Sequence, residues 1–448
     1  MKLHIKIHDS VVKIISSHLE YNWEQPYDES NIKNSVGSGF FFDHHGHILT
    51  CAHVVEAAKF IYIEIPQISS QRYEASVISI YAAADLAVLQ IHGYRNRKTL
   101  PLGSCRNVKQ GASSTGIGFP LGQKNLKLNE GIISGTEGYK IQSDTPINPG
   151  NSGGPLLVKG RVIGINQSGI TGTNSITYAT PIDIFLARRK EMLPHKSIQQ
   201  PTLLQMPYFG MLVHGASPEL LHLRHCPNMS GGTIIARIFP GSIFQHHLQP
   251  NDILLQCNGH NIDSYMFMNW NFGPFKLIEL SAYFAFVAPQ QKLKLSIWNG
   301  KKKINHTIQV QLTPLAVDNI IPVYQPVQYI QFAGLILCNL TRNHVRQQVR
   351  EQLYRWDALN YYMDPAHFNE PAILCTHIVP NSFFDKFDIL ETGMILHKIN
   401  DTPVTSVHQI KSIVQSITKS ILLQFSDNIQ VAISKSDYQR LADISSDK

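Results

Sequence analysis

Short apolar runs alternate with turns that contain glycine, proline or asparagine along the first 190 residues. Strands are predicted at residues 11–15, 36–42, 48–50, 60–65, 73–81 and 86–91. Regular short strands separated by turn signals are typical of an all-β sandwich or barrel. A short helix is predicted over residues 53–58, directly after the third strand. The pattern therefore predicts a mainly β first domain over residues 1–190.

Two later stretches lose the strand pattern and are predicted to be linkers, residues 191–205 and the proline-containing residues 314–326. The apolar segment 277–287 between them is predicted to be a helix that lines a groove, or simply part of a core. After the second linker, an apolar–glycine–apolar loop at 332–336 repeats a loop of the preceding region. The recurrence indicates an internal duplication, with a helical segment at 343–362 interrupting the second copy.

Composition sets the size and class of the protein. A chain of 448 residues is too long for one typical domain, so two to four domains are expected. Its 43% hydrophobic and 16% charged residues are typical of a globular protein with substantial cores. The net charge of +7 comes from basic residues that are scattered rather than clustered, so no nucleic acid partner is expected.

The six cysteines bear on the compartment. They are far apart and contain no CxxC pair, which fits neither a zinc site nor a dense disulfide framework. Scattered thiols suit a reducing compartment. The first residues lack the apolar core of a signal peptide, and no apolar run approaches the roughly 20 residues that span a bilayer. We therefore expect a cytoplasmic protein without a membrane span, a metal or a cofactor.

The candidate chemistry begins with the stretch 147–157, where Ser152 lies among glycines and prolines ahead of an apolar run. Glycine adopts backbone conformations that are closed to other residues and allows another chain to approach closely. An oxyanion hole needs backbone N–H groups that face one point. The N–H groups of Gly150 and Ser152 are the candidate donors. Taken alone, the stretch is equally well explained as a hairpin that carries an ordinary serine.

Two upstream residues change that balance. His53, Asp85 and Ser152 occur in one of the known chain orders of the serine-protease catalytic triad. His53 lies at a corner that would fix its ring, and Asp85 opens an apolar strand that would bury its carboxylate. Each residue alone is more often structural than catalytic. Together and in this order, they predict a nucleophilic Ser152, a general base His53 and an orienting Asp85.

The motifs that carry these residues resemble the HtrA/Deg family of trypsin-like serine proteases over residues 10–190. They are residues 37–40, 50–55, 85–89, 141–144 and 148–156. The resemblance implies two β-barrels with the triad in the cleft between them.

Cys51 departs from the family pattern, which usually has asparagine there, but its side chain need not touch the chemistry. By similarity to the family, Pro146 forms the floor of the specificity pocket, Ile147 and Ile176 line it, and Ser168 lies near its wall. No acid is among them, so the pocket is expected to favour a small or medium apolar residue. Discrimination by size alone is weak, about 1–3 kcal/mol per methylene, so cleavage is expected to be broad.

Residues 206–313 resemble a PDZ domain, and residues 328–448 resemble a second, more divergent one. The peptide-binding loop of the first would be Phe209, Gly210, Met211 and Leu212. PDZ domains bind an extended peptide as an added strand, with loop N–H groups on its terminal carboxylate. A small α+β domain with no ligand remains the alternative for the first copy. For the second, packing within an oligomer is as well supported as peptide binding.

Two PDZ-like domains most resemble the plant-type Deg proteases, and the resemblance implies a homo-oligomer built from trimers. The sequence thus predicts a mainly β protein with a trypsin-like double barrel and two α+β PDZ-like domains. Its expected function is ATP-independent endopeptidase cleavage of unfolded or damaged polypeptides through an acyl-enzyme, with C-terminal peptides binding at the first PDZ domain. The alternative is a PDZ scaffold or chaperone-like holdase whose triad is seldom assembled.

Overall fold

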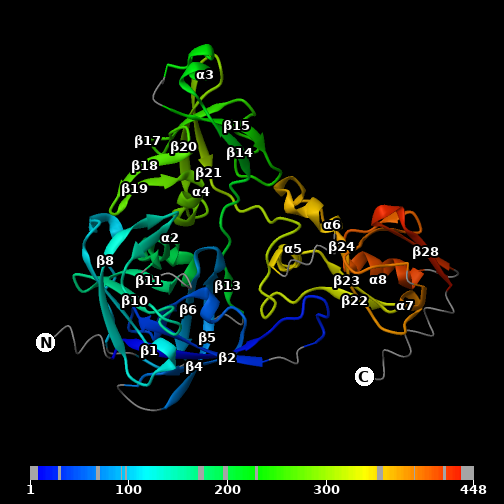
Figure 1. Cartoon of the computed structure of the whole chain (residues 1–448), viewed down its shortest axis with the longest axis horizontal. Coiled ribbons are helices and arrows are strands. Elements are labelled where there is room, and N and C mark those ends of the chain that lie inside the picture. The colour runs from blue at the N-terminus through cyan, green and yellow to red at the C-terminus, as the bar shows by residue number, and fades with distance from the viewer. Residues whose placement is uncertain are drawn as a thin grey trace. The chain divides into compact units, whose positions relative to one another are not determined.

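The chain divides into two compact units, shown in Figure 1. The computed structural model describes residues 9–28, 32–66, 71–91, 93–95, 98–169, 176–194, 200–227, 231–350, 357–387, 389–416 and 420–434. The first unit comprises Met1–Leu19 and Ile32–Thr313, and the second comprises Glu20–Asn31 and Pro314–Lys448.

The first barrel closes through six antiparallel strands. They are β1 (Val11–Leu19), β2 (Ile32–Phe41), β3 (His47–Thr50), β4 (Ala58–Glu64), β5 (Arg72–Tyr81) and β6 (Leu86–Ile91). Their order is β5-β4-β1-β2-β3-β6, and β6 pairs back to β5. Alternate residues such as Val12, Ile14 and Phe40 are fully buried, because successive side chains of a strand point to opposite faces.

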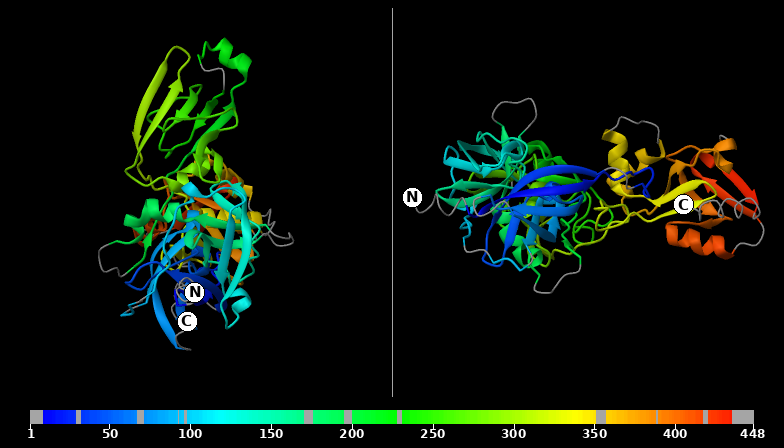
Figure 2. Two further views of the ribbon diagram at one scale, coloured as in Figure 1. Left: turned by 90° about the vertical axis from the view of Figure 1, so that its left-hand side faces the viewer. Right: turned by 90° about the horizontal axis from the view of Figure 1, so that it is seen from below.

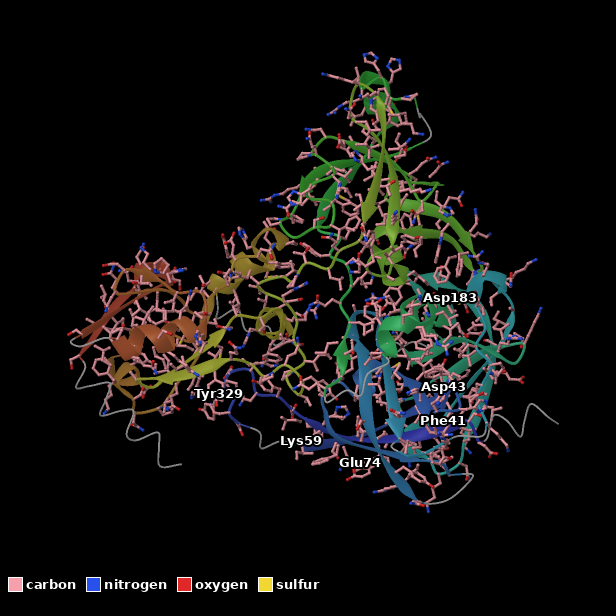
Figure 3. The ribbon with its side chains drawn as sticks, turned by 180° about the vertical axis from the view of Figure 1, so that it is seen from behind. Phe41, Asp43, Lys59, Glu74, Asp183 and Tyr329 are labelled. Carbon is pink, nitrogen blue, oxygen red and sulfur yellow. The ribbon has the colours of Figure 1, made fainter. Side chains whose placement is uncertain are left out.

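The second barrel is also closed. Its strands are β7 (Ser113–Gly118), β8 (Lys127–Glu137), β9 (Lys140–Ser143), β10 (Pro155–Val158), β11 (Arg161–Gly169) and β12 (Thr177–Pro181), in the order β10-β11-β12-β9-β8-β7. Helix α2 (Ile182–Met192) follows, and Asp183 in its first turn accepts hydrogen bonds from Ser104 Oγ and Cys105 N at 2.6 and 2.7 Å (Figure 3). The predicted mainly β fold with a double barrel is confirmed.

Two short 3₁₀ turns connect strands of the first barrel, one after β3 and one after β5. The helix predicted over 53–58 is wrong: η1 spans Ala52–Val54, and β4 begins at Ala58. Val54 and Val55 are both buried, so these β-branched residues pack into the barrel instead of extending a helix. The second turn, η2 (Ala82–Ala84), ends at Asp85, whose φ of 55° is left-handed.

The first PDZ-like domain is built on an antiparallel sheet. Its strands are β14 (Met211–Gly215), β15 (Thr233–Ile238), β16 (Ile253–Cys257), β20 (Lys292–Trp298) and β21 (Lys303–Gln309), in that order, with β17 (His260–Asn261) beside β16. A short helix, α3 (Pro218–Leu223), follows β14. Strand β14 lies at the edge of this sheet.

The helix predicted over 277–287 is only partly present. Residues Phe275–Glu279 form strand β19, which pairs with β18 (Phe267–Phe272), and only α4 (Leu280–Tyr283) and η5 (Phe284–Phe286) are helical. Aromatic packing explains the difference, because the Trp270 ring lies 4.5 Å from Phe272 and 4.8 Å from Phe286 between ring centroids. The stretch 191–205 is likewise not all linker, since β13 (Thr202–Leu203) pairs in parallel with β5.

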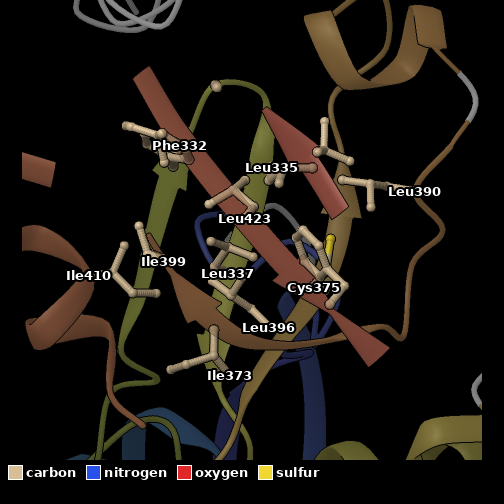
Figure 4. Close-up of a cluster of buried hydrophobic side chains, with 14 of the residues drawn as sticks. Phe332, Leu335, Leu337, Ile373, Cys375, Leu390, Leu396, Ile399, Ile410 and Leu423 are labelled. Atoms are coloured by element: carbon tan, nitrogen blue, oxygen red, sulfur yellow. The ribbon is translucent and has the colours of Figure 1, made fainter. Parts of the chain in front are cut away.

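The second unit contains a sheet with the order β22-β23-β24-β25-β27-β28, drawn in yellow to red in Figures 1 and 2. These strands are β22 (Tyr329–Phe332), β23 (Leu335–Asn339), β24 (Ile373–Ile378), β25 (Ile395–Ile399), β27 (Ser420–Phe425) and β28 (Gln430–Ser434), with β26 (Thr402–Pro403) beside β25. Its core includes Leu337, Ile399 and Leu423, and Ile410 from α8 (Val407–Ser416) packs against it (Figure 4). Short helices surround the sheet: α5 (Arg342–Arg350), α6 (Asp357–Asn360), η6 (Tyr361–Met363), η7 (Pro365–His367) and α7 (Phe383–Phe387).

The two PDZ-like sheets differ at one edge. Phe239 N donates to Gly210 O at 2.9 Å before β14, and Val379 N donates to Gly334 O at 2.8 Å before β23. These equivalent bonds match β14 of the first sheet with β23 of the second. Strand β14 has no neighbour on its outer side within the described sheet, whereas β22 pairs with that side of β23.

The segment that connects β1 and β2 belongs to the second unit by its contacts. Tyr21 and Trp23 pack against a small apolar cluster that contains Val327 and Ile336. The Trp23 ring meets the buried imidazole of His344 edge-on, with 5.1 Å between ring centroids. No sequence pattern in this segment predicted the contact.

Candidate active site

The imidazole of His53 and the carboxylate of Asp85 form a hydrogen-bonded pair. His53 Nδ1 lies 2.8 Å from Asp85 Oδ2 and 2.9 Å from Oδ1, and the His53 backbone N–H donates to Oδ1 at 3.0 Å. Turn η1 carries the histidine, and the aspartate follows η2. A carboxylate that accepts the Nδ1 proton leaves Nε2 as the basic nitrogen of the ring.

The surroundings of His53 raise its pKa. Burial lowers the pKa, but the hydrogen bond to Asp85 and its negative charge outweigh burial, and Glu56 adds to the rise. The His53 side chain is 44% exposed and that of Asp85 is 20% exposed. The ring therefore remains reachable from solvent, while the carboxylate behind it is largely covered.

Ser152 is buried, with 8% of its surface exposed. Its hydroxyl donates to Gln167 O at 2.5 Å. Within the described residues, this is the bond that the hydroxyl makes, and it has none to the His53 ring. Of the three residues that the sequence predicted, all of which the structure describes, His53 is bonded directly to Asp85, whereas Ser152 is bonded to neither. A rotation of the Ser152 side chain would be needed to direct its hydroxyl at the imidazole.

Hydrogen bonds to the carbonyl oxygens of Pro149 and Gly150 hold the backbone before Ser152 in place. Ser38 Oγ donates to Gly150 O at 2.7 Å, and Leu121 N donates to Pro149 O at 2.6 Å. Among the described residues, the N–H groups of Gly150 and Ser152 find no acceptor. Two unpaired amides on either side of one residue suit a developing oxyanion.

Glycine is required at two positions of this loop. Gly150 has a φ of 97°, and a Cβ there would lie 2.4 Å from Phe119 O. Gly153 has a φ of 87°, and a Cβ there would lie 2.1 Å from Ser38 O. Both the backbone conformation and the close approach of another strand exclude a side chain.

Ser38 is a site residue that sequence reasoning missed as such. It lies within the quoted 37–40 motif on β2, its hydroxyl accepts from Phe119 N at 3.0 Å, and it donates to Gly150 O. It therefore links the first barrel to the loop that carries the candidate oxyanion-hole donors, Gly150 and Ser152. The motif itself was the signal that could have identified it.

The predicted pocket residues lie in three segments. Pro146 is exposed and its carbonyl accepts from Asn129 Nδ2 at 2.7 Å, while Ile147 and Ile176 are half-buried. Ser168 lies on β11, and its side chain is outside the described residues. The assignment of these residues to a specificity pocket stays a prediction.

Cys51 is fully buried beside the pair, and its thiol donates to Asn166 O at 3.2 Å. Burial, and then the negative charge of Asp85, hold the pKa of the thiol well above its usual range. Ligand atoms of Cys51, His53 and Asp85 lie within 4.8 Å of one another, a donor set that zinc accepts. The ligand atoms of His53 and Asp85 are already hydrogen-bonded to each other, so a metal ion would have to break that bond. We therefore assign no metal to this site.

The predicted peptide-binding loop of the first PDZ-like domain precedes the edge strand β14. Gly210 has a φ of 50°, and Phe209 O accepts from Ser242 Oγ at 2.6 Å. The Phe209 ring lies 5.5 Å from the rings of Phe244 and Phe284 between centroids. Met211 is buried and Leu212 is about half exposed, so one large apolar side chain of the open edge strand is accessible.

Comparisons with known proteins agree with this architecture. Residues 37–165 match the trypsin-like peptidase domain family. A probable periplasmic serine endoprotease, DegP-like, of Halomonas elongata is 32% identical over 248 residues, which are 52% of this chain and 50% of that protein. The mitochondrial serine protease HTRA2 of Bos taurus is 30% identical over 53% of this chain and 55% of its own length. The chain thus spans about half the length of these curated relatives.

The solved structure of the HtrA-type protease AlgW with a tripeptide has a TM-score of 0.52 at 23% identity, over 70% of this chain and 96% of that chain. This likeness supports the fold. Two closed barrels and the matched region define the class of trypsin-like serine peptidases. Within it, the relatives and solved structures that the chain matches are DegP-like, HTRA2 and HtrA-type serine proteases. The comparisons give no support to the scaffold or holdase alternative.

Proposed function

We propose that the protein is an ATP-independent serine endopeptidase that cleaves unfolded or damaged polypeptides. The observation that carries the proposal is the bonded His53–Asp85 pair beside two unpaired amides at Gly150 and Ser152. In this proposal, the arrangement supplies a base, its orienting carboxylate and the oxyanion donors. The match of residues 37–165 to the trypsin-like peptidase domain family and the similarity to DegP-like endoproteases support the same class of reaction.

In this proposal, Ser152 Oγ bonds to the scissile carbonyl carbon while its proton passes to His53 Nε2. The carbonyl oxygen gains negative charge between the N–H groups of Gly150 and Ser152. The C–N bond then breaks, and the leaving amine takes the proton from His53, which leaves an acyl-enzyme. Water repeats the sequence, restores Ser152 and releases the new carboxylic acid. Asp85 stabilises the imidazolium and remains ionised throughout.

A fluorophosphonate probe tests the proposal, because it labels a serine only when the serine is activated. The wild-type chain should be labelled and should degrade casein without ATP. Ser152→Ala should lose both activities, with a fall in cleavage of about 10⁴- to 10⁶-fold. Proteolysis near the wild-type rate in the purified Ser152→Ala protein would refute the assignment.

We further propose that the pocket accepts small or medium apolar residues such as Val, Ala, Ile and Leu. Pro146, Ile147 and Ile176 bring no charge to the proposed pocket, which supports the preference. A proteome-derived peptide library digested by the protein should show cuts mostly after these residues. A majority of cuts after Lys or Arg would contradict the proposed pocket.

For partners, we propose that the first PDZ-like domain binds apolar C-terminal peptides at the edge strand β14. The open edge of β14 and the half-exposed Leu212 on it support this assignment. In the second domain, β22 pairs with the corresponding edge of β23, which argues for a structural role. We also propose that the protein is a homo-oligomer built from trimers. Light scattering at micromolar concentration tests this proposal, and a monomer would contradict it.

For location, we propose the cytoplasm. All six cysteines are free and buried, which supports a reducing compartment, although the relatives are named as periplasmic and mitochondrial proteins. None of the described helices combines the length and the apolar character that crossing a membrane requires. Cell fractionation with a tagged chain tests the proposal, and recovery from a secretory or organellar fraction would refute it.

A further inference from the structure

The turn that presents Asp85 is held from the other barrel. Tyr139 Oη, in the turn between β8 and β9, donates to Ala83 O at 3.1 Å. Thr180 Oγ1, on β12, donates to the next carbonyl, Ala84 O, at 3.0 Å. Two consecutive carbonyls of η2 in the first barrel are thus bonded to hydroxyls of the second barrel.

The same network reaches the nucleophile. Gln167 Nε2 donates to Thr180 Oγ1 at 2.8 Å, and Gln167 O accepts the Ser152 hydroxyl. Thr180 and Gln167 are 0% and 4% exposed, so water competes little for these bonds. Gln167 therefore contacts both the serine and the threonine that anchors the aspartate turn.

The turn itself is short. It contains three residues, and the backbone bond that closes it runs from Asp85 N to Ala82 O at 3.0 Å. Asp85 follows in the left-handed region with a φ of 55°, which costs free energy for a residue other than glycine. Ala82 and Ala83 are exposed, so of the three residues only the buried Ala84 adds side-chain packing to the two hydroxyl bonds.

We propose that Tyr139 and Thr180 are positioning residues that hold Asp85 in register with His53 across the two barrels. Neither residue would touch the substrate or the reacting atoms. Each would act by fixing a carbonyl of η2 and, through it, the direction of the Asp85 carboxylate. The inference rests on the proposed function, because positioning matters only if the pair works as a base.

The chemistry of the hydroxyls suits this role. Burial, and then the negative charge of Asp85, raise the pKa of Tyr139 to about 12. The phenol therefore keeps its proton, and remains a donor to Ala83 O, over the whole range in which a serine protease works. The threonine hydroxyl does not ionise at all in that range.

Removing one hydroxyl at a time tests the proposal in the full-length protein. Tyr139→Phe and Thr180→Val keep the volume of each side chain but cannot donate to η2. Each should lower kcat/KM for a peptide substrate about 10- to 100-fold, with KM nearly unchanged, since small misplacements cost this much. Thr180→Ser retains the hydroxyl and should restore most of the lost rate.

The pH profile separates positioning from general loosening of the fold. The charged or titratable groups that act on His53 are Asp85, Glu56 and Lys140, and His18 interacts with it. Weaker alignment of Asp85 should reduce the rise in the pKa of His53, so the acid limb of kcat/KM should move to lower pH. A merely destabilised protein would lose activity without that displacement.

Thr233→Val provides the matched control. Thr233 is a buried strand threonine whose hydroxyl also donates to a backbone carbonyl, Asp263 O at 2.8 Å, but it lies in the first PDZ-like domain. If Tyr139→Phe and Thr180→Val match this control in rate and pH profile, the proposal is wrong. Absence of probe labelling in the wild type, or cleavage by Ser152→Ala, would instead refute the proposed function. Tyr139 is only half-buried, so we expect Tyr139→Phe to fold. This variant therefore still tests the proposal if Thr180→Val fails to fold.

Discussion

At the scale of residues, the pKa of His53 links the structure to the predicted rate of cleavage. Burial alone would lower the pKa of His53, yet its bond to Asp85 and the charge of Asp85 raise it above the ordinary value. A general base must be unprotonated to accept the Ser152 proton. A raised pKa keeps His53 protonated, and so inactive, to a higher pH. Once the ring is neutral, however, it is a stronger base.

This balance predicts the pH dependence. The kcat/KM of the wild type should fall as the pH drops through the raised pKa of His53, above the usual value of about 6.5. Asp85→Asn should lower kcat about 10⁴-fold at neutral pH, because the ring loses its orienting partner. Stopped-assay rates between pH 5 and 9 check both statements, and an unchanged rate in Asp85→Asn would contradict the triad.

The glycine that follows the nucleophile yields a steric prediction. A Cβ at Gly153 would lie 2.1 Å from both Ser38 O and Thr50 Oγ1. Gly153→Ala should therefore displace the Ser152 loop, remove probe labelling and destabilise the protease domain by about 1–3 kcal/mol. Gly111→Ala is a suitable control, since Gly111 also has a positive φ but nothing lies near its Cβ position. Equal labelling of the two variants would show that the loop tolerates a side chain.

Sequence could single out His53, Asp85 and Ser152 as candidates, because each stands in a local motif and the three occur in a known order, and the structure bonds the first two directly. It could not predict Tyr139 or Thr180 as partners of the aspartate turn. Their bonds to Ala83 and Ala84 cross 56 and 96 residues of chain and arise only when both barrels have closed. The rotation of the Ser152 hydroxyl toward Gln167 likewise has no local sequence signal.

At the scale of elements, strand edges distinguish the two PDZ-like domains. An unpaired strand edge offers N–H and C=O groups to an incoming strand, and β14 has such an edge while β23 is paired with β22. The duplication was visible in the sequence, but the pairing of β22 was not. An apolar–glycine–apolar loop precedes both strands, so the local pattern is the same where the pairing differs.

Paired glycine variants test which domain binds peptide. A Cβ at Gly210 would lie 2.6 Å from the Tyr208 ring, and one at Gly334 would lie 2.2 Å from Ser382 Cβ. The wild type should bind an apolar C-terminal peptide at one site per chain in isothermal titration. Gly210→Ala should abolish the binding, whereas Gly334→Ala should leave it unchanged. Two sites in the wild type would contradict the closed edge of the second domain.

The strand at 275–279 shows why an apolar run misleads at this scale. Residues 277–287 are apolar enough for a helix, yet Trp270 contacts Phe272 and Phe275 before that run and Phe286 within it. Their packing favours a two-stranded hairpin ahead of the short α4. Tertiary contacts of this kind override the intrinsic preference of a segment, and they are not visible until the hairpin partner is known.

At the scale of the whole molecule, the first PDZ-like domain touches the elements that lead to Asp85. Tyr81, the last residue of β5, is buried and its hydroxyl donates to Ala285 O in η5 at 3.5 Å. Turn η2 begins at the next residue. A Cβ at Gly138, beside Tyr139, would be in van der Waals contact with Ala282 of α4 at 3.9 Å. The α4–η5 segment therefore adjoins the residue that precedes η2 and the residue that precedes Tyr139.

A ligand shifts an equilibrium only through different contacts in the two states, and we predict that a bound peptide changes the contacts of α4 and η5. Peptide binding between β14 and the α4–η5 segment should favour the aligned turn and the rotated Ser152 hydroxyl. We therefore predict that an apolar C-terminal peptide raises the cleavage rate of a second substrate about fivefold or more. Deletion of residues 206–448 should remove the stimulation, and Gly210→Ala should remove it without deletion. If the truncated and full-length proteins respond identically to the peptide in a fluorogenic assay, the PDZ-like domains act as tethers or assembly elements and not as switches.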